Sequence, residues 1–410
     1  MDNEVINFYK KNDLNTFGLI SNPFTGRIYS KKENLIKAIK ILKNDEKDDL
    51  NYLAEILYKK QKVEIKLVDW VDIGHVATYP KARVSSITSR VFNKLIYNKD
   101  RRSITKKSNK KLKIKNEVSY FEQIPLEIKR FYPTLLKTEF NKEFASYEMD
   151  YIGHPSLSEM YLFGKISPNA FYRIIDCISY VFDLFYKNKP LINENAAWLY
   201  SNKTKNRQLK LENLLIQKKF ENLERIYFND FVVNGCSFPS LKNSFAFLFE
   251  KLEKIQLNRP LHLGHGDLCF NNILVDPING RINLIDPKAD IHKRLNLCGV
   301  IDNFYDISKL NHSFEGFYDS VVNNLYYLHF EDIKDIQFKV YKPDSYKIIN
   351  KYFRKKIVEG KIDKDTLLAL TGNLFLSMLP LHLDDPCRMI GLAIIGSIYI
   401  NGKDLSLLYL

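Results

Sequence analysis

Between residues 261 and 290 the chain brings together side chains that can bind a metal ion and accept a proton. His265, Asp267, Asn272 and Asp286 all fall within this stretch. Two short apolar runs lie on either side of the turn-forming sequence Asp-Pro-Ile-Asn-Gly, and this pattern predicts a β-hairpin. A tight hairpin brings its ends together, so we expect Asp267 and Asn272 at the entry to face Asp286 at the exit.

Two carboxylates and one amide at a single point suit phosphoryl transfer. Mg²⁺ prefers hard oxygen ligands and keeps substrate phosphates in its shell, and Asn272 and Asp286 can supply such oxygens. Asp267 is then left to take a proton from an attacking hydroxyl. The alternative is a surface hairpin in which Asp and Asn only form turns. The coincidence of four spaced polar residues with the right apolar context favours the chemical interpretation.

The pattern His-x-Asp-x-x-x-x-Asn, followed by an Asp after a second strand, resembles the catalytic and metal-binding segments of protein-kinase-like phosphotransferases. Gly266 and the ending Asp286-Pro287 make it more similar to the aminoglycoside phosphotransferase and choline kinase branch. This resemblance implies ATP and Mg²⁺ as cofactors and a hydroxyl of a small molecule as the acceptor. It also implies that Asp267 is the catalytic base and that His265 supports the loop by hydrogen bonding.

The resemblance implies an α+β fold of two lobes, preceded by an α/β appendage at 1–81. Residues 82–155 look like the small β-rich N-lobe of a kinase, and residues 156–410 like a mainly helical C-lobe with the catalytic loop. In the C-lobe, a capping box of Ser156 and Glu159 predicts a helix start, and a start at Ser158 is equally compatible with the sequence. Further helices are predicted by apolar periodicity at 168–187, 220–233 and 241–256, with a helix or crossing segment at 193–217.

Strands are predicted at 90–97 and 103–108, with a helix at about 110–123. In the resembled kinases, a strand lysine holds the α- and β-phosphates and is oriented by a glutamate of the following helix. Lys106 and Glu117 match that pair, since Lys106 shares a strand face with Ile104, which would floor the adenine pocket. Lys107 points the other way and is the weaker candidate. An ordinary exposed lysine and helix glutamate are the alternative.

Two further segments are similar to nucleotide-binding parts of the family. Ser85 and Ser86 take the place of glycines in the phosphate-binding loop, where hydroxyls and backbone N–H groups can cradle phosphate. A plain serine-rich loop is equally compatible with these residues. The strand that begins near 146 resembles the one entering the hinge, whose backbone binds adenine. We expect that hinge at Met149, Tyr151 and Ile152.

Two segments after the hairpin also resemble the family. Residues 298–310 are similar to a segment that opens a helix, where Asp306 can cap the helix and hold the catalytic-loop backbone. Residues 374–388 resemble a segment of kinase-like proteins from bacterial surface-polysaccharide loci, with an apolar helix broken at Pro380. There His382, Asp384 and Arg388 either line the acceptor pocket or form a helix-cap and salt-bridge corner.

Residues 1–80 are similar to the closing part of sugar-nucleotide nucleotidyltransferases. Helices are predicted at 33–42 and 48–60 and a strand at 63–68, before the Trp-x-Asp-Ile-Gly turn that begins at Trp70. The glycine-rich start of such enzymes is missing, so we interpret this part as a remnant or a docking module. It motivates an alternative function, a pseudo-kinase that binds nucleotide and partners a separate nucleotidyltransferase.

The composition bounds these interpretations. The 410 residues are 45% hydrophobic, which is enough for a sizeable core in two or three domains. The densest basic run, at 98–115, invites a nucleic-acid interpretation. The net charge of +14 instead reflects a general lysine bias, so we do not expect nucleic acid as a partner. No membrane span and no secretion signal are expected, and five scattered cysteines favour the reduced cytoplasm. A protein kinase is disfavoured because no Ala-Pro-Glu motif follows Asp286.

Overall fold

The chain forms two compact units, Met1–Ile87 and Thr88–Leu410, and each is treated separately below. The structure is a computed structural model that describes residues 4–9, 24–29, 32–44, 53, 56, 57, 63–68 and 93–410, except 165, 188, 189, 218, 219, 256 and 410. The second unit joins a sheet lobe to a helical lobe, which is the α+β class predicted from sequence. The predicted boundaries at 81/82 and 155/156 stay predictions.

The first unit contains a three-stranded sheet in the order β2-β1-β3. Strand β1 (Glu4–Tyr9) is antiparallel to β2 (Phe24–Tyr29) and parallel to β3 (Val63–Val68). Helix α1 (Lys32–Asn44) follows β2 in the chain, where the apolar periodicity predicted a helix. The predicted turn at Trp70 lies outside the described residues, and the similarity to a nucleotidyltransferase stays a prediction.

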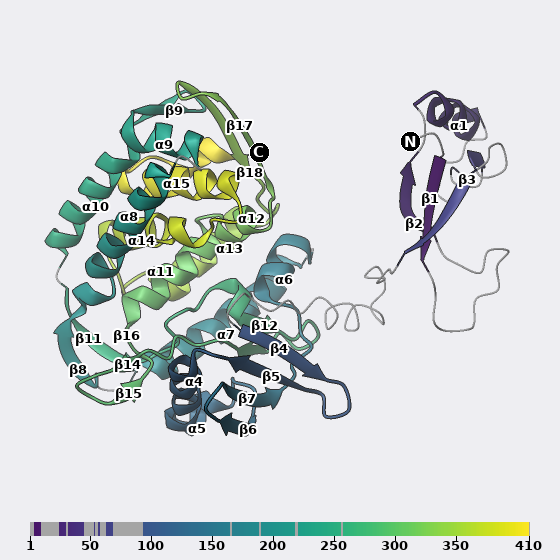
Figure 1. Cartoon of the computed structure of the whole chain (residues 1–410). Coiled ribbons are helices and arrows are strands. Elements are labelled where there is room, and N and C mark those ends of the chain that lie inside the picture. The colour runs from purple at the N-terminus through teal and green to yellow at the C-terminus, as the bar shows by residue number, and fades with distance from the viewer. Residues whose placement is uncertain are drawn as a thin grey trace. The chain divides into compact units, whose positions relative to one another are not determined.

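The second unit begins with a small lobe, an antiparallel sheet in the order β4-β5-β7-β6 (Figure 1). Its elements are β4 (Asn93–Asn98), β5 (Ser103–Ser108), α4 (Lys111–Gln123), α5 (Leu126–Lys129), β6 (Leu135–Phe140) and β7 (Ala145–Asp150). The apolar face of α4, with Ile114, Val118 and Phe121, is buried. Strand β5 lies between β4 and β7, so its backbone is paired on both sides. The predicted strands and helix are confirmed, but β6 was not anticipated.

The large lobe is mainly helical (Figure 1). Its helices are α6 (Leu157–Phe163), α7 (Pro168–Tyr186), α8 (Ser201–Ile216), α9 (Glu221–Phe228), α10 (Leu241–Lys254), α11 (Asn303–Phe314), α12 (Tyr318–Val322), α13 (Tyr346–Phe353), α14 (Lys364–Met378) and α15 (Pro386–Ile400). Short helical turns are η1 (Ala196–Trp198), η2 (Phe270–Asn272), η3 (Arg354–Val358), η4 (Leu379–Leu381) and η5 (Leu405–Leu408). The capping box is present, because Ser156 accepts from the Glu159 N–H and the Glu159 side chain accepts from the Ser156 N–H. The apolar helix before Pro380 is confirmed as α14.

Short strands join the helices of the large lobe. They are β8 (Ile192–Asn195), β9 (Phe231–Val233), β10 (Cys236–Phe238), β11 (Asn258–Leu263), β12 (Ile273–Val275), β13 (Ile282–Leu284), β14 (Ile291–His292), β15 (Leu297–Cys298), β16 (Val300–Asp302), β17 (Tyr326–Asp332) and β18 (Asp335–Val340). Strands β12 and β13 form the predicted hairpin, with Ile273 paired to Leu284. The helix predicted at 220–233 was wrong in its second half, because it ends at Phe228 and β9 pairs with β10 and β18.

Most of the buried apolar side chains of the second unit form one continuous core. Helices α14 and α15 lie deep in it, because twelve residues of each are buried. No helix among the described residues has both the length and the apolar character needed to cross a membrane. Both strands of the β12–β13 hairpin are anchored in this core, which places the loops at their ends in fixed positions.

Candidate active site

Lys106 of β5 lies where the two lobes meet. Its Nζ atom is 2.8 Å from Glu117 Oε2 on α4 and 2.6 Å from Asp286 Oδ1 after β13. Burial acts to lower the pKa of Lys106, but Asp286 and Glu117 outweigh burial and raise that pKa above its ordinary value. Lys106 is therefore a fixed cation at the end of the hairpin. The strand and the hairpin thus meet as the sequence predicted.

Glu117 is the buried anchor of this lysine. Its side chain is 2% exposed, and Oε2 also accepts a hydrogen bond of 2.9 Å from the Tyr147 hydroxyl on β7. Lys107 points away from this pair, and its Nζ atom lies 3.3 Å from the centroid of the Phe144 ring. The alternation of side chains along β5 therefore directs only Lys106 toward Asp286.

The catalytic-loop residues His265 and Asp267 are held by backbone contacts. His265 Nδ1 accepts a hydrogen bond of 3.2 Å from the Asp267 N–H, and Nε2 lies 3.1 Å from the Ile285 carbonyl oxygen. An accepting Nδ1 leaves the proton on Nε2, which then donates to Ile285. Burial lowers the pKa of His265, which agrees with a neutral ring. His265 thus fastens the loop to the end of the hairpin, as expected.

Asp306 of α11 holds the same loop from the other side. Its Oδ2 atom accepts hydrogen bonds from the N–H groups of His265 and Gly266, each at 3.2 Å, and from the Tyr186 hydroxyl at 2.6 Å. The expectation that Asp306 caps α11 was wrong, because Asp302 is the N-cap residue and accepts from the Phe304 N–H. Asp306 lies inside the helix, because α11 begins one turn earlier than the resembled segment predicted.

Asp267 is paired with a lysine that sequence reasoning missed. Lys309 Nζ on α11 lies 2.9 Å from Asp267 Oδ1. Burial acts to raise the pKa of Asp267, but Lys309 outweighs burial and lowers that pKa to about 2. Asn272 Nδ2 donates to the backbone oxygen of Asp267 at 2.9 Å and to Oδ2 at 3.3 Å. Because Asp306 and Lys309 lie one helical turn apart, they share a face of α11, and this spacing could have placed Lys309 beside the catalytic loop.

Asp286 has a left-handed backbone, with φ of 52°. Asp tolerates this conformation better than most residues, but it remains sparsely populated outside glycine. Burial acts to raise the pKa of Asp286, but Lys106 outweighs burial and lowers it, so the carboxylate is ionised. Its side chain is 49% exposed, which leaves oxygen accessible beside Lys106. Strained backbone at such a residue is typical of functional sites.

The donor set at this point fits Mg²⁺. Asn272 uses its Nδ2 group toward Asp267, so its amide oxygen remains as an acceptor, and Asp286 is an exposed carboxylate. Both are hard oxygen donors, and two protein ligands are enough for an ion whose other ligands are phosphates and water. Among the described residues, no group of three or more His, Cys, Asp or Glu gathers as a metal site. The residues therefore suit a metal ion that arrives with a nucleotide.

The predicted adenine hinge is only partly free to bind a base. The Tyr151 N–H donates to the Arg102 carbonyl at 2.9 Å, and the Asp150 N–H donates to the Thr134 carbonyl at 3.1 Å. Met149 is paired within the sheet to Ile104. Ile152 is then the residue of the predicted span that remains as a candidate contact. Ser85 and Ser86, the predicted phosphate-loop residues, lie outside the described residues.

His382, Asp384 and Arg388 lie around the start of α15. Arg388 Nη1 is 2.9 Å from Asp384 Oδ2, and Asp385 accepts the Arg388 N–H as the N-cap of the helix. These are the contacts of the helix-cap and salt-bridge alternative. No hydrogen bond or ion pair in the described part of the chain joins Asp384 or Arg388 to Asp267. A role at the acceptor stays a prediction.

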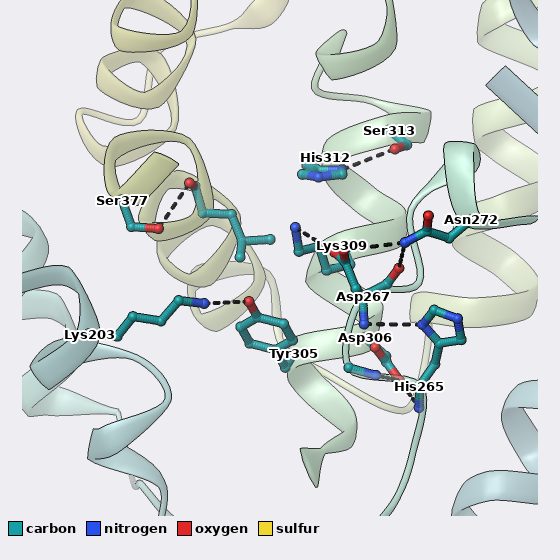
Figure 2. Close-up of polar contacts among 12 residues, drawn as sticks. Lys203, His265, Asp267, Asn272, Tyr305, Asp306, Lys309, His312, Ser313 and Ser377 are labelled. Atoms are coloured by element: carbon teal, nitrogen blue, oxygen red, sulfur yellow. Dashed lines mark hydrogen bonds and ion pairs between the residues drawn. The ribbon is translucent and has the colours of Figure 1, made fainter. Parts of the chain in front are cut away.

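A second group of residues beside Asp267 was also missed. Tyr305 and Lys309 lie one turn apart on α11, and Lys203 Nζ of α8 donates to the Tyr305 hydroxyl at 2.7 Å (Figure 2). No local pattern predicted this contact, because α8 and α11 lie about a hundred residues apart in the chain.

Comparisons with solved structures find aminoglycoside and spectinomycin phosphotransferases at low sequence identity. Aminoglycoside phosphotransferase APH(4)-Ia is 12% identical, with 80% of this chain and 98% of that chain covered and a TM-score of 0.46. Spectinomycin phosphotransferase APH(9)-Ia, with ADP and spectinomycin, is 11% identical, with 77% and 86% covered and a TM-score of 0.41. APH(2″)-IIa, with streptomycin and ATP, is 11% identical, with 83% and 100% covered and a TM-score of 0.41. No protein-family model and no curated protein matches the chain.

Proposed function

We propose that this protein is an ATP-dependent phosphotransferase that phosphorylates a hydroxyl of a small molecule. The observation that carries the proposal is the position of Lys106 of the small lobe, 2.6 Å from Asp286 and 2.8 Å from Glu117. Asp267, on the loop that enters the same hairpin, is joined to Asn272 by hydrogen bonds. A fixed cation, two carboxylates and an amide are the groups that position a nucleotide for in-line transfer.

Each residue takes a distinct role in this proposal. Lys106, oriented by Glu117, holds the nucleotide phosphates. Asn272 and Asp286 hold Mg²⁺, which when bound neutralises charge on the phosphates. Ile152 and its neighbours in the hinge support the adenine.

Asp267 positions the acceptor hydroxyl and takes its proton. The hydroxyl oxygen attacks the γ-phosphorus, the bond to the β,γ-bridging oxygen breaks, and ADP leaves with the electron pair. Because the pKa of Asp267 is about 2, the carboxylate is ionised at neutral pH but is a weak base. A weak base suffices where the transition state is loose and the proton leaves late. Asp267 therefore acts mainly by orienting the hydroxyl.

The sequence resemblance suggests a sugar or an aminoalcohol as the acceptor, in bacterial surface-polysaccharide biosynthesis. It also suggests a nucleotidyltransferase as a partner of the first unit. Both suggestions rest on that resemblance alone.

The proposal is tested by Asp267→Asn, with Asp344→Asn, an exposed aspartate, as the matched control. ADP formation with a panel of sugars, sugar phosphates and aminoalcohols should fall by about a thousandfold in Asp267→Asn and stay unchanged in the control. Calorimetry should show that Mg-ATP still binds both variants. Unchanged turnover in Asp267→Asn would refute the role of this residue. Binding of Mg-ATP by the wild type without transfer to any acceptor would favour the nucleotide-binding partner instead.

A further inference from the structure

Four basic side chains from three separate parts of the large lobe gather around Tyr305, and one of them, Lys309, contacts Asp267. Lys203 and Arg207 lie one turn apart on α8, Lys288 follows the hairpin, and Lys309 lies on α11. We call these four residues the basic cluster. Tyr305 lies among them, because its hydroxyl is 2.7 Å from Lys203 Nζ and its ring centroid is 5.5 Å from Lys288 Nζ.

The basic cluster is part of the catalytic loop's surroundings. Lys309 contacts Asp267 directly at 2.9 Å, and the Lys288 N–H donates to the His265 carbonyl at 2.8 Å. In the view of Figure 2, Asp267 lies between Asn272 and His265 on one side and the Tyr305–Lys203 pair on the other. In that view the Tyr305–Lys203 pair therefore lies on the other side of Asp267 from Asn272, one of the two residues proposed to hold Mg²⁺.

The positive charge of the basic cluster is only partly neutralised by the protein. Lys309 is paired with Asp267, and Lys288 with the exposed Asp290 at 3.3 Å. Lys203 and Arg207 form no ion pair within the described part of the chain, and Arg207 Nη1 contacts only the Ser377 carbonyl and hydroxyl, at 3.2 and 3.4 Å.

Both unpaired cations are half-buried, so their uncompensated charge is unfavourable. Burial lowers the pKa of Lys203; Tyr305 opposes this, and the positive charges of Lys288 and Arg207 add to it. Burial likewise lowers the pKa of Arg207, against the opposing influence of Tyr305 and Asp267. Like charges that are close together and partly withdrawn from water are stabilised by an anion that binds between them. Guanidinium and ammonium groups are the side chains that bind phosphate and carboxylate most strongly.

We propose that the acceptor carries an oxyanion, a phosphomonoester or a carboxylate, which the basic cluster binds while Asp267 orients the reacting hydroxyl. This inference rests on the proposed function and narrows it, because a neutral sugar or a cationic aminoalcohol would leave the cluster uncompensated. The transferred phosphoryl group still goes from the γ-position of ATP to the hydroxyl oxygen, and the hydroxyl proton goes to Asp267. The oxyanion of the acceptor takes no part in bond making.

The first test compares matched acceptors: a hexose, its 6-phosphate, the corresponding uronic acid and the corresponding amino sugar. With Mg-ATP, kcat/KM should be at least about tenfold higher for the two anionic compounds. In Arg207→Gln that preference should be lost through a rise in acceptor KM, whereas Lys210→Gln, on the exposed face of the same helix, should keep it. Equal or better turnover of the neutral or amino sugar would overturn the inference and leave the proposed function intact.

A second measurement needs no turnover. The chain has two tryptophans, and the ring centroid of Trp198 lies 5.7 Å from Lys288 Nζ. In a Trp70→Phe background, tryptophan fluorescence therefore comes from Trp198 alone and reports on the basic cluster. Saturating Mg²⁺ and AMP-PNP fill the nucleotide's phosphate sites, and inorganic phosphate or acetate is then titrated. A saturable signal that Arg207→Gln loses and Lys210→Gln keeps supports the anion site, and the stronger ligand identifies the class of oxyanion. Absence of that signal overturns the inference. A signal without transfer to any acceptor counts against the proposed phosphotransferase activity and not against the anion site.

Discussion

Glu117→Gln is the substitution that most directly tests how the small lobe supports the site. Glu117 Oε1 accepts a hydrogen bond of 3.0 Å from Lys106 Nζ, and Oε2 accepts one of 2.9 Å from the Tyr147 hydroxyl. Oε2 also lies 2.8 Å from Lys106 Nζ. A glutamine has nearly the same shape but no charge, so Lys106 loses its negative partner on α4, and the amide N–H₂ group that replaces one carboxylate oxygen faces the lysine Nζ without an acceptor.

The size of the effect follows from these contacts. A buried donor left without a partner costs about 1–3 kcal/mol, and a buried ion pair that loses one member costs about 3–5 kcal/mol. Lys106 keeps Asp286 at 2.6 Å, so we expect the lower part of this combined range, about 2 kcal/mol. For a unit of this size, that corresponds to a fall in Tm of about 3 °C.

The effect on nucleotide use should be larger than the effect on stability. When Asp286 is engaged with Mg²⁺, Lys106 depends on Glu117 alone for its orientation. A misplaced phosphate-binding lysine should lower kcat/KM for ATP by about a hundredfold.

Thermal unfolding and steady-state kinetics with varied ATP measure the two effects. Glu122→Gln is the matched control, because Glu122 is an exposed residue of the same helix, and it should change neither quantity. The reasoning is refuted if Glu117→Gln melts at the wild-type temperature and keeps its KM for ATP within twofold.

Two further predictions concern pH. In Lys309→Met, the largest influence that opposes the burial of Asp267 is lost, so the pKa of Asp267 should rise from about 2 and an acid limb should appear in the pH profile of kcat/KM. Lys309→Arg should show no such limb. Burial acts to raise the pKa of Tyr305 and Asp267 opposes ionisation, but Lys203, Lys309 and Lys288 outweigh both and lower the pKa to about 8. Because this pKa lies below the ordinary 10.0, the phenolate forms from pH 8 upward and repels an anionic acceptor, so acceptor KM should rise there in the wild type and not in Tyr305→Phe.

The parts of the site that could be predicted from sequence are those carried by short segments. The hairpin that presents Asp286 is local, because its apolar runs and turn lie within a few residues of one another. Lys106 was separated from Lys107 by strand alternation alone. The pairing of β9 with β18 could not be predicted, because Val233 and Ile336 lie about a hundred residues apart, and a helical pattern extended through β9.

The basic cluster was missed for the same physical reason. Lys203 and Arg207 look like ordinary surface residues of a polar, lysine-rich helix, because i, i+4 spacing alone does not say which face is covered. Only the packing of α8 beside α11 brings Lys203 to Tyr305. A general lysine bias in the composition further hides any local concentration of charge.

Contacts between the lobes indicate how a nucleotide can enter the site. The Leu284 N–H donates to the Phe131 carbonyl at 2.7 Å, and the Cys298 N–H donates to Gln123 Oε1 at 3.1 Å. Both contacts hold the α4–α5 side of the small lobe against the large lobe, so Glu117 keeps its place relative to the catalytic loop. Binding of Mg-ATP then requires only that the contact between Lys106 and Asp286 be exchanged for contacts to phosphate and metal. A separation of the lobes is not needed for that exchange, because the pair that must open lies at the exposed carboxylate.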